Sequence, residues 1–137
     1  MQMYPTMKKH NRNFSFVQTH NHLMDVLTDH KLASLGDSFI NFAFSLALSE
    51  KKGMPEGKKV KGTLLAEALR RAGLREQLPS RMTSHILADA GEALIVYAWL
   101  QGHITLEETM AKLEENNDPV ESLTLLLKKT KCRIKLS

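Results

Sequence analysis

Three acidic residues stand inside apolar, helix-patterned stretches of this sequence, where a hydrophobic core would exclude them. Asp89 and Glu92 are three positions apart, so on a helix they project from the same face, one turn from each other. Asp37 lies in an earlier apolar stretch that could pack against theirs. Carboxylates that converge from two helices repel one another unless protons or a cation neutralise them. The pattern therefore favours a divalent metal ion held for hydrolysis, with Asp37, Asp89 and Glu92 as its ligands.

A purely structural role for the same acids is the alternative. Buried carboxylates also form hydrogen-bond networks, and acids at helix ends pair with basic side chains such as Arg81 or Lys31. Residue spacing alone does not separate this interpretation from the metal site.

Three further polar residues share a helix face with the acids. His85 stands four positions before Asp89, and His30 stands seven before Asp37. A histidine beside the acids would shuttle a proton or donate to a phosphate, whereas one at the rim of a cleft would do neither. Asn41, one turn after Asp37, could orient a ligand or a water, or make only a packing contact.

The elements that carry these residues are predicted to be helices throughout. Residues 1–14 are expected to be a flexible N-terminal segment, and 15–137 a single domain. Helices are expected at about 17–29, 30–49, 63–72 and 83–100, followed by two that begin after Thr105 and Asp118. The helix over 30–49 is apolar nearly all round, which predicts that it is central and buried. The fold class is therefore all-α, with six or seven helices.

Composition limits the class of protein. The chain has 137 residues, 42% of them hydrophobic, enough for one core. The net charge of +4 permits a polyanionic partner without demanding one. A lone cysteine, Cys132, excludes an internal disulfide framework and fits a reducing compartment. With no uninterrupted apolar run long enough for a bilayer and no signal-peptide pattern, we expect a cytoplasmic protein without a membrane partner.

Three sequence blocks resemble the ribonuclease III endonuclease domain in order and spacing. They are LGDS at 35–38, LLAEA at 64–68 and ILADAGEALI at 86–95. The resemblance covers roughly residues 20–105. It implies an all-helical fold of that family, a homodimer, and metal-dependent cleavage of double-stranded RNA. It also places Asp37, Asp89 and Glu92 on acidic active-site positions of the family.

The chain departs from the bacterial pattern of this family at two acidic positions. Ala33 and His30 stand where that pattern has glutamates. Only about thirty residues follow the matched blocks, so no double-stranded-RNA-binding domain is expected. The chain is in these respects similar to Mini-ribonuclease III and to compact archaeal ribonuclease III-like proteins.

The expected cofactor is Mg²⁺, because it prefers hard oxygen ligands and binds through one or two carboxylates together with substrate phosphates. Mn²⁺ is the alternative, favoured if His85 also binds the metal. Basic residues cluster between the second and third predicted helices, and a further one precedes the fourth. Those expected to bind RNA are Lys51, Lys52, Lys58, Lys59, Lys61 and Arg81. A solvated loop that only keeps the protein soluble is the alternative for the lysines.

Two functions remain open at this point. The first is a metal-dependent endoribonuclease for double-stranded or structured RNA that acts as a homodimer, since the helix around residues 35–44 has few polar positions to face water. The second is a ribonuclease III-like scaffold that binds RNA or a ribosomal partner and has lost catalysis. Ala33 and His30 favour it, because they replace two acidic residues of the bacterial pattern.

Overall fold

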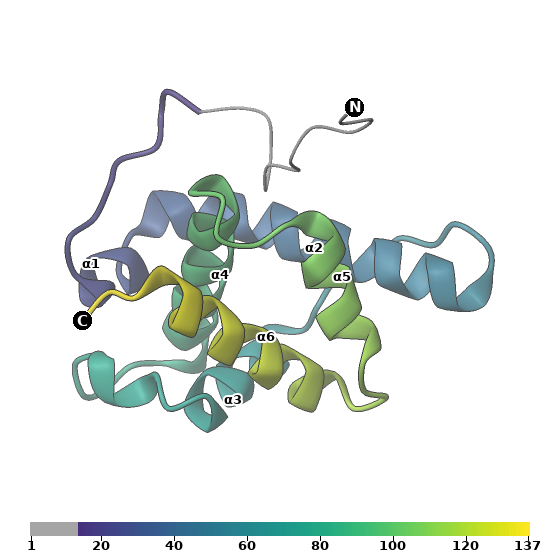
Figure 1. Ribbon diagram of the computed structural model, residues 1–137. Coiled ribbons are helices and arrows are strands. Elements are labelled where there is room, and N and C mark those ends of the chain that lie inside the picture. The colour runs from purple at the N-terminus through teal and green to yellow at the C-terminus, as the bar shows by residue number, and fades with distance from the viewer. Residues whose placement is uncertain (1–13) are drawn as a thin grey trace, which may run out of the picture.

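The protein is described here by a computed structural model covering residues 14–137, and it is all-helical over that range (Figure 1). This confirms the predicted fold class. The first thirteen residues of the predicted N-terminal segment lie outside the described residues. The helices are α1 (Leu23–Leu27), α2 (His30–Lys52), α3 (Gly62–Arg71), α4 (Ser84–Leu100), α5 (Leu106–Glu114) and α6 (Pro119–Ile134), with a 3₁₀ turn at Arg75–Gln77.

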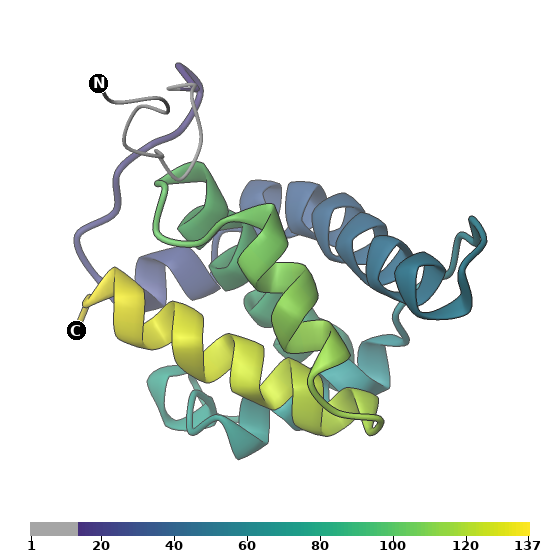
Figure 2. The ribbon, with the colours of Figure 1, turned by 45° about the vertical axis from the view of Figure 1, so that its right-hand side comes forward.

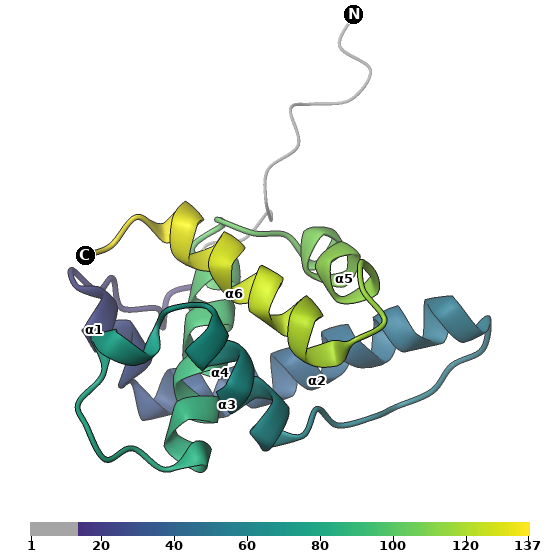
Figure 3. The ribbon, with the colours of Figure 1, turned by 90° about the horizontal axis from the view of Figure 1, so that it is seen from below.

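Helix α4 is the centre of the domain. Twelve of its seventeen residues are buried, and α1, α2, α3 and α6 all pack against it. In Figures 1 and 3, α4 lies between α2 on one side and α6 on the other. Figure 2 shows α5 and α6 side by side, and the two helices contact each other. The buried side chains of α4, Glu92 among them, are therefore held by the surrounding helices.

The prediction that the helix over 30–49 is the central, buried one is wrong. Helix α2 buries one narrow side made largely of small residues and leaves Leu35 and Phe42 exposed. Its other side carries a row of polar residues that includes Asp37 and Asn41. Helix α4 takes the central place because its alanines and glycine let several helices approach it at once.

Most helix starts follow the capping rules that the sequence indicates. The Thr83 hydroxyl accepts from the backbone N–H of Ile86 at the start of α4. Thr105 and Glu108 form the predicted capping box of α5, and Asp118 caps α6 ahead of Pro119. These short-range signals fix where α4, α5 and α6 begin.

The first predicted helix, at 17–29, is much shorter in the structure. Only Leu23–Leu27 is helical. The preceding segment is held by long-range contacts instead: the backbone N–H of His20 donates to the Tyr97 hydroxyl at 3.0 Å, and His20 Nε2 lies 3.0 Å from Asp29 Oδ2. Tertiary contacts with α4 and the start of α2 thus replace helical hydrogen bonds there.

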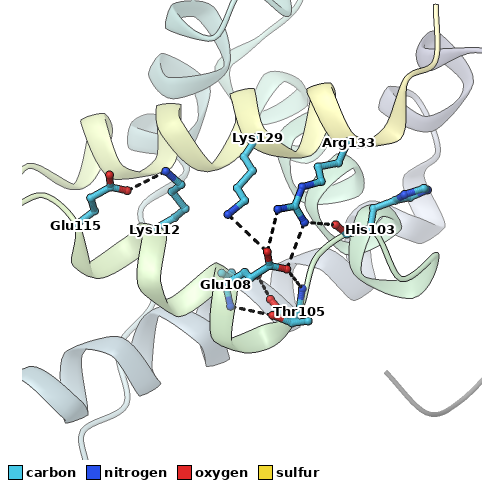
Figure 4. Close-up of polar contacts among 8 residues, drawn as sticks. His103, Thr105, Glu108, Lys112, Glu115, Lys129 and Arg133 are labelled. Carbon is cyan, nitrogen blue, oxygen red and sulfur yellow. Dashed lines mark hydrogen bonds and ion pairs between the residues drawn. The ribbon is translucent and has the colours of Figure 1, made fainter. Parts of the chain in front are cut away.

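A polar cluster joins α5 to α6 (Figure 4). Glu108 closes the capping box with Thr105 and also accepts a hydrogen bond from Arg133 Nη2 at 2.9 Å. Arg133 Nη1 donates to the backbone oxygen of His103, and Lys129 lies 3.6 Å from the Glu108 carboxylate. Burial, and then the Arg133 charge, hold the pKa of His103 below its ordinary value. The cluster fixes α6 against α5 on the face away from α2.

Helix α2 is long and apolar enough to cross a membrane by length and composition alone. Core helices of globular proteins pass the same test. Its extensive packing on α4 and α5 and its row of polar side chains are features of a helix within a globular domain.

Candidate functional site

The three predicted acids line one cleft of about 410 Å³ between α2 and α4. Asp37 comes from α2, and Asp89 and Glu92 come from α4. The other lining residues are His30, Ala33, Ser34, Lys59, Val60, Gly62, His85 and Ala88. The structure thus brings the acids together and places both predicted histidines at the same cleft.

The two helices approach closely because one residue has no side chain. A Cβ placed on Gly36 would collide with the backbone carbonyl of Glu92. With glycine at this position, the backbones of α2 and α4 come into contact beside Asp37, so the glycine of the LGDS block has a packing role.

Glu92 is the buried member of the acidic group, with 9% of its surface exposed. Burial, followed by the neighbouring carboxylates of Asp37 and Asp89, raises the pKa of Glu92 to about 8. The three carboxylates are therefore close enough to interact electrostatically, and at neutral pH Glu92 holds a proton.

The two aspartates are more accessible and have separate polar neighbours. Asp37 Oδ1 accepts a hydrogen bond from Asn41 Nδ2 at 3.1 Å. Asp89 Oδ2 lies 3.7 Å from Nε2 of His85, whose side chain is 85% exposed. None of the three acids forms an ion pair with lysine or arginine within residues 14–137. The predicted alternative of helix-end pairing with Arg81 or Lys31 therefore has no support in this part of the chain.

The donor set suits a hard divalent cation, because all three side chains offer carboxylate oxygens. Among the described residues, however, no group of three His, Cys, Asp or Glu side chains has the arrangement of a formed metal site. Asp37 and Asp89 line the cleft together with Glu92. The residues fit such a cation in the chemistry of their oxygens and in lining one cleft.

A family model for ribonuclease III matches residues 30–134, which span α2 to α6 and every residue that lines the cleft. The chain belongs to the ribonuclease III family. No curated protein was found to match it. Membership supports an RNA-cleaving or RNA-binding role and, at the level of the family, a nuclease-type enzyme.

Two lining residues of this ribonuclease III domain are the positions that depart from the bacterial pattern. Ala33 is buried at the floor of the cleft and His30 is exposed at its edge. The bacterial pattern would have two further glutamates at these positions. Among the described residues that line the cleft, three acids are therefore present.

The predicted RNA-binding lysines separate into two groups. Lys59 lines the acidic cleft, and Lys58, Lys59 and Lys61 line a neighbouring pocket of about 260 Å³. Lys51 Nζ instead donates to Asn117, and Lys52 pairs with Glu56 at 2.8 Å.

The last of the predicted basic residues, Arg81, is placed differently. It is exposed in the loop before α4, with a φ of 63°, and does not line the cleft. Of the six predicted basic residues, Lys59 is the one that the structure brings to the acids.

Sequence reasoning missed how the lysine-rich segment is anchored to α2. Residues 56–60, which we term the strap, run along α2 before α3 begins (Figure 3). The Ser49 hydroxyl bonds both backbone groups of Glu56, and the Ser45 hydroxyl bonds both backbone groups of Lys58. Asn41 Oδ1 accepts from the backbone N–H of Val60 at 2.7 Å. The strap is thus a fixed wall of the site and not a free loop.

The missed signal is present in the sequence as a spacing. Asn41, Ser45 and Ser49 are four residues apart and share one face of α2. Their partners are two residues apart, which is the period of an extended chain. Three polar side chains spaced four residues apart on a helix, followed by a short polar loop, form the pattern that could have indicated the strap.

Proposed function

We propose that this protein is a divalent-metal-dependent endoribonuclease that hydrolyses phosphodiester bonds in double-stranded or structured RNA. The observation that carries the proposal is the convergence of Asp37, Asp89 and Glu92 on one cleft, where burial and then the two aspartates raise the pKa of Glu92 to about 8. A domain that used α2 and α4 only for packing would gain nothing from a buried acid beside two others.

Asp37, Asp89 and Glu92 would hold the cation, Mg²⁺ or alternatively Mn²⁺. When bound, it would supply an activated water and neutralise charge on the phosphate. Glu92 must release its proton to act as a ligand, because a metal-bound carboxylate is ionised. Asn41 keeps one oxygen of Asp37 in a hydrogen bond and so restricts its rotation.

RNA would reach the acids along a rim that carries positive charge on one side. Lys59 lies at the cleft, and Lys58 and Lys61 lie on the adjacent surface. Phosphate contacts from such lysines read the shape of an A-form duplex and not its sequence. His85, almost fully exposed beside Asp89, would donate to a phosphate oxygen.

A homodimer completes the proposal. Leu35 and Phe42 are seven residues apart on α2 and are 40% and 57% exposed, so they form an exposed apolar stripe along this helix. Leu35 also lines a groove of about 390 Å³ with Phe16 and Val17. A two-fold axis through this stripe would bring two cleft-bearing α2 helices together, with one cleft available for each strand of a duplex.

The inactive scaffold is the second candidate. It is favoured by Ala33 and His30, which leave three acids at the cleft, and by the lack of a formed metal arrangement among residues 14–137. A scaffold of this kind would bind duplex RNA through the same lysines without cutting it.

Cleavage of an end-labelled RNA duplex in Mg²⁺ or Mn²⁺ separates the two functions. We expect the native chain to cut, and Asp37→Asn and Glu92→Gln each to lower the cleavage rate at least a hundredfold while duplex binding persists. Duplex binding without cleavage by the native chain would establish the scaffold. Equal cleavage by all three proteins would show that the acids are not catalytic.

A further inference from the structure

One side chain on α2 contacts the acidic cleft and the strap at the same time. Asn41 is half-buried one turn after Asp37. Its Nδ2 donates to Asp37 Oδ1 at 3.1 Å, while its Oδ1 accepts from the backbone N–H of Val60 at 2.7 Å. An amide is suited to this place because it offers a donor and an acceptor in fixed relative positions.

The contact to Val60 belongs to a longer set of similar contacts. Ser45 and Ser49, one and two turns further along α2, each bond both the N–H and the C=O of a single strap residue, at 2.8 to 3.1 Å. Those hydroxyls touch no carboxylate of the cleft. Of the three residues in this row, Asn41 is therefore the one that bonds both the strap and an acid of the cleft.

The strap sets where Lys59 lies. In an extended chain, successive residues direct their backbone groups to opposite sides. The backbone groups of Glu56, Lys58 and Val60 face α2, so those of the intervening Lys59 face away from it, and its side chain lines the cleft. Displacement of the strap would move a positive charge relative to the acids.

We propose that Asn41 is a positioning residue that holds Asp37 and the Lys59-bearing strap in one arrangement. This inference rests on the proposed nuclease function for its consequence in catalysis. A phosphate bound by Lys59 is then presented at a fixed offset from the Asp37 carboxylate, and the loss of Asn41 releases both groups together. Loss of a serine further along the row releases only the strap.

The matched pair Asn41→Ala and Ser45→Ala separates these roles in steady-state cleavage. We expect Ser45→Ala to raise KM for duplex RNA about threefold with kcat within twofold of native, since it loosens the strap alone. We expect Asn41→Ala to raise KM similarly and to lower kcat at least tenfold, because Asp37 also loses its donor. Equal kcat values for the two variants would overturn the inference.

Asn41→Asp provides a third variant that keeps one contact and removes the other. An aspartate at this position still accepts from the Val60 N–H but has no donor for Asp37. We expect Asn41→Asp to retain native protection of the Val60 amide in hydrogen exchange and yet to lower kcat at least tenfold. Native kcat in Asn41→Asp would overturn the positioning of Asp37.

Two readouts do not need cleavage and keep this inference separate from the proposed function. Exchange of the Val60 amide, measured without RNA or metal, should accelerate at least tenfold in Asn41→Ala. Mn²⁺ affinity, measured without RNA, should fall about threefold or more in Asn41→Ala and stay unchanged in Ser45→Ala. If the native chain does not cut RNA but both readouts behave in this way, the nuclease proposal fails and the positioning role stands. If neither readout moves, the positioning role fails, whatever the activity.

Discussion

Gly36 of α2 lies directly against the backbone carbonyl of Glu92 in α4, with no room between them for a side chain. This contact sets how closely the two helices approach. It also brings Asp37, the next residue, close to the Glu92 carboxyl, whose pKa is raised first by burial and then by Asp37. The geometry of the site therefore begins with a packing contact between two backbones.

Gly36→Ala should disturb both stability and the site. A methyl group here overlaps a backbone atom that cannot rotate away, so we expect the free energy of unfolding to fall by about 1–3 kcal/mol. Cleavage should fall more than tenfold in the fraction that remains folded, because the acids separate. Gly57→Ala is the matched control, since a Cβ there meets nothing within 4 Å. Native stability in Gly36→Ala, measured by urea denaturation, would contradict the close approach.

Glu92 should make the metal-free protein less stable as the pH rises. Its carboxyl keeps a proton to about pH 8 in the folded state, whereas the ordinary value of 4.5 applies to the unfolded chain. Between these values the folded state holds the extra proton, so the free energy of unfolding decreases with pH, by about 1.4 kcal/mol for each unit of pKa difference.

Glu92→Gln should remove most of this decrease, because a carboxamide stays neutral. Urea denaturation at several pH values from 4.5 to 8.5, in the presence of a chelator, checks this. A native protein whose stability stays flat over that range would mean that Glu92 is not perturbed. Mg²⁺ should restore stability at pH 8 in the native chain and not in the variant.

Phe42→Glu should dissociate the proposed homodimer. The ring is more than half exposed on the stripe that it forms with Leu35, and a charge there opposes burial against a second copy. We expect sedimentation equilibrium to give a dimer for the native chain and a monomer for the variant, with duplex cleavage reduced. Met54→Glu, at an exposed apolar residue off the stripe, should remain dimeric. A native chain that is monomeric at micromolar concentration would contradict the dimer.

Lys59→Ala should weaken RNA binding more than Lys52→Ala. Lys59 lines the acidic cleft, while Lys52 is paired with Glu56. We expect KM for duplex RNA to rise about tenfold for Lys59→Ala, and the slope of binding against salt concentration to fall by about 1. Lys52→Ala should stay within about twofold of native. Equal effects in the two variants would show that the lysines act only as diffuse charge.

The local signals in the sequence fix much of this fold. Capping residues such as Thr83 and Asp118 depend on their immediate neighbours, so the starts of α4 and α6 are predictable. The start of the first helix is not, because His20 bonds to Tyr97 across the domain and no local pattern reports such a contact. The central helix was misassigned because apolar content does not distinguish a helix that is surrounded from one with an exposed stripe.

The candidate site also has a part that the sequence predicts and a part that it does not. The i, i+3 spacing of Asp89 and Glu92 predicts that they share a face, and the family blocks place Asp37 with them. The role of Lys59 among several lysines was out of reach, because it depends on how the strap is attached to α2 through Asn41 and Ser45. The spacing of Asn41 and Ser45 on α2 hints at that attachment, but only the structure shows which residues of the strap they bond.

The binding of Mn²⁺ to the metal-free protein, followed by the electron paramagnetic resonance signal of the free ion, tests the account most directly. We predict that the native chain binds Mn²⁺, that Asp37→Asn and Glu92→Gln each weaken this binding at least tenfold, and that Lys59→Ala leaves it intact. Binding that is unchanged in both acid variants would contradict a cation site built from α2 and α4.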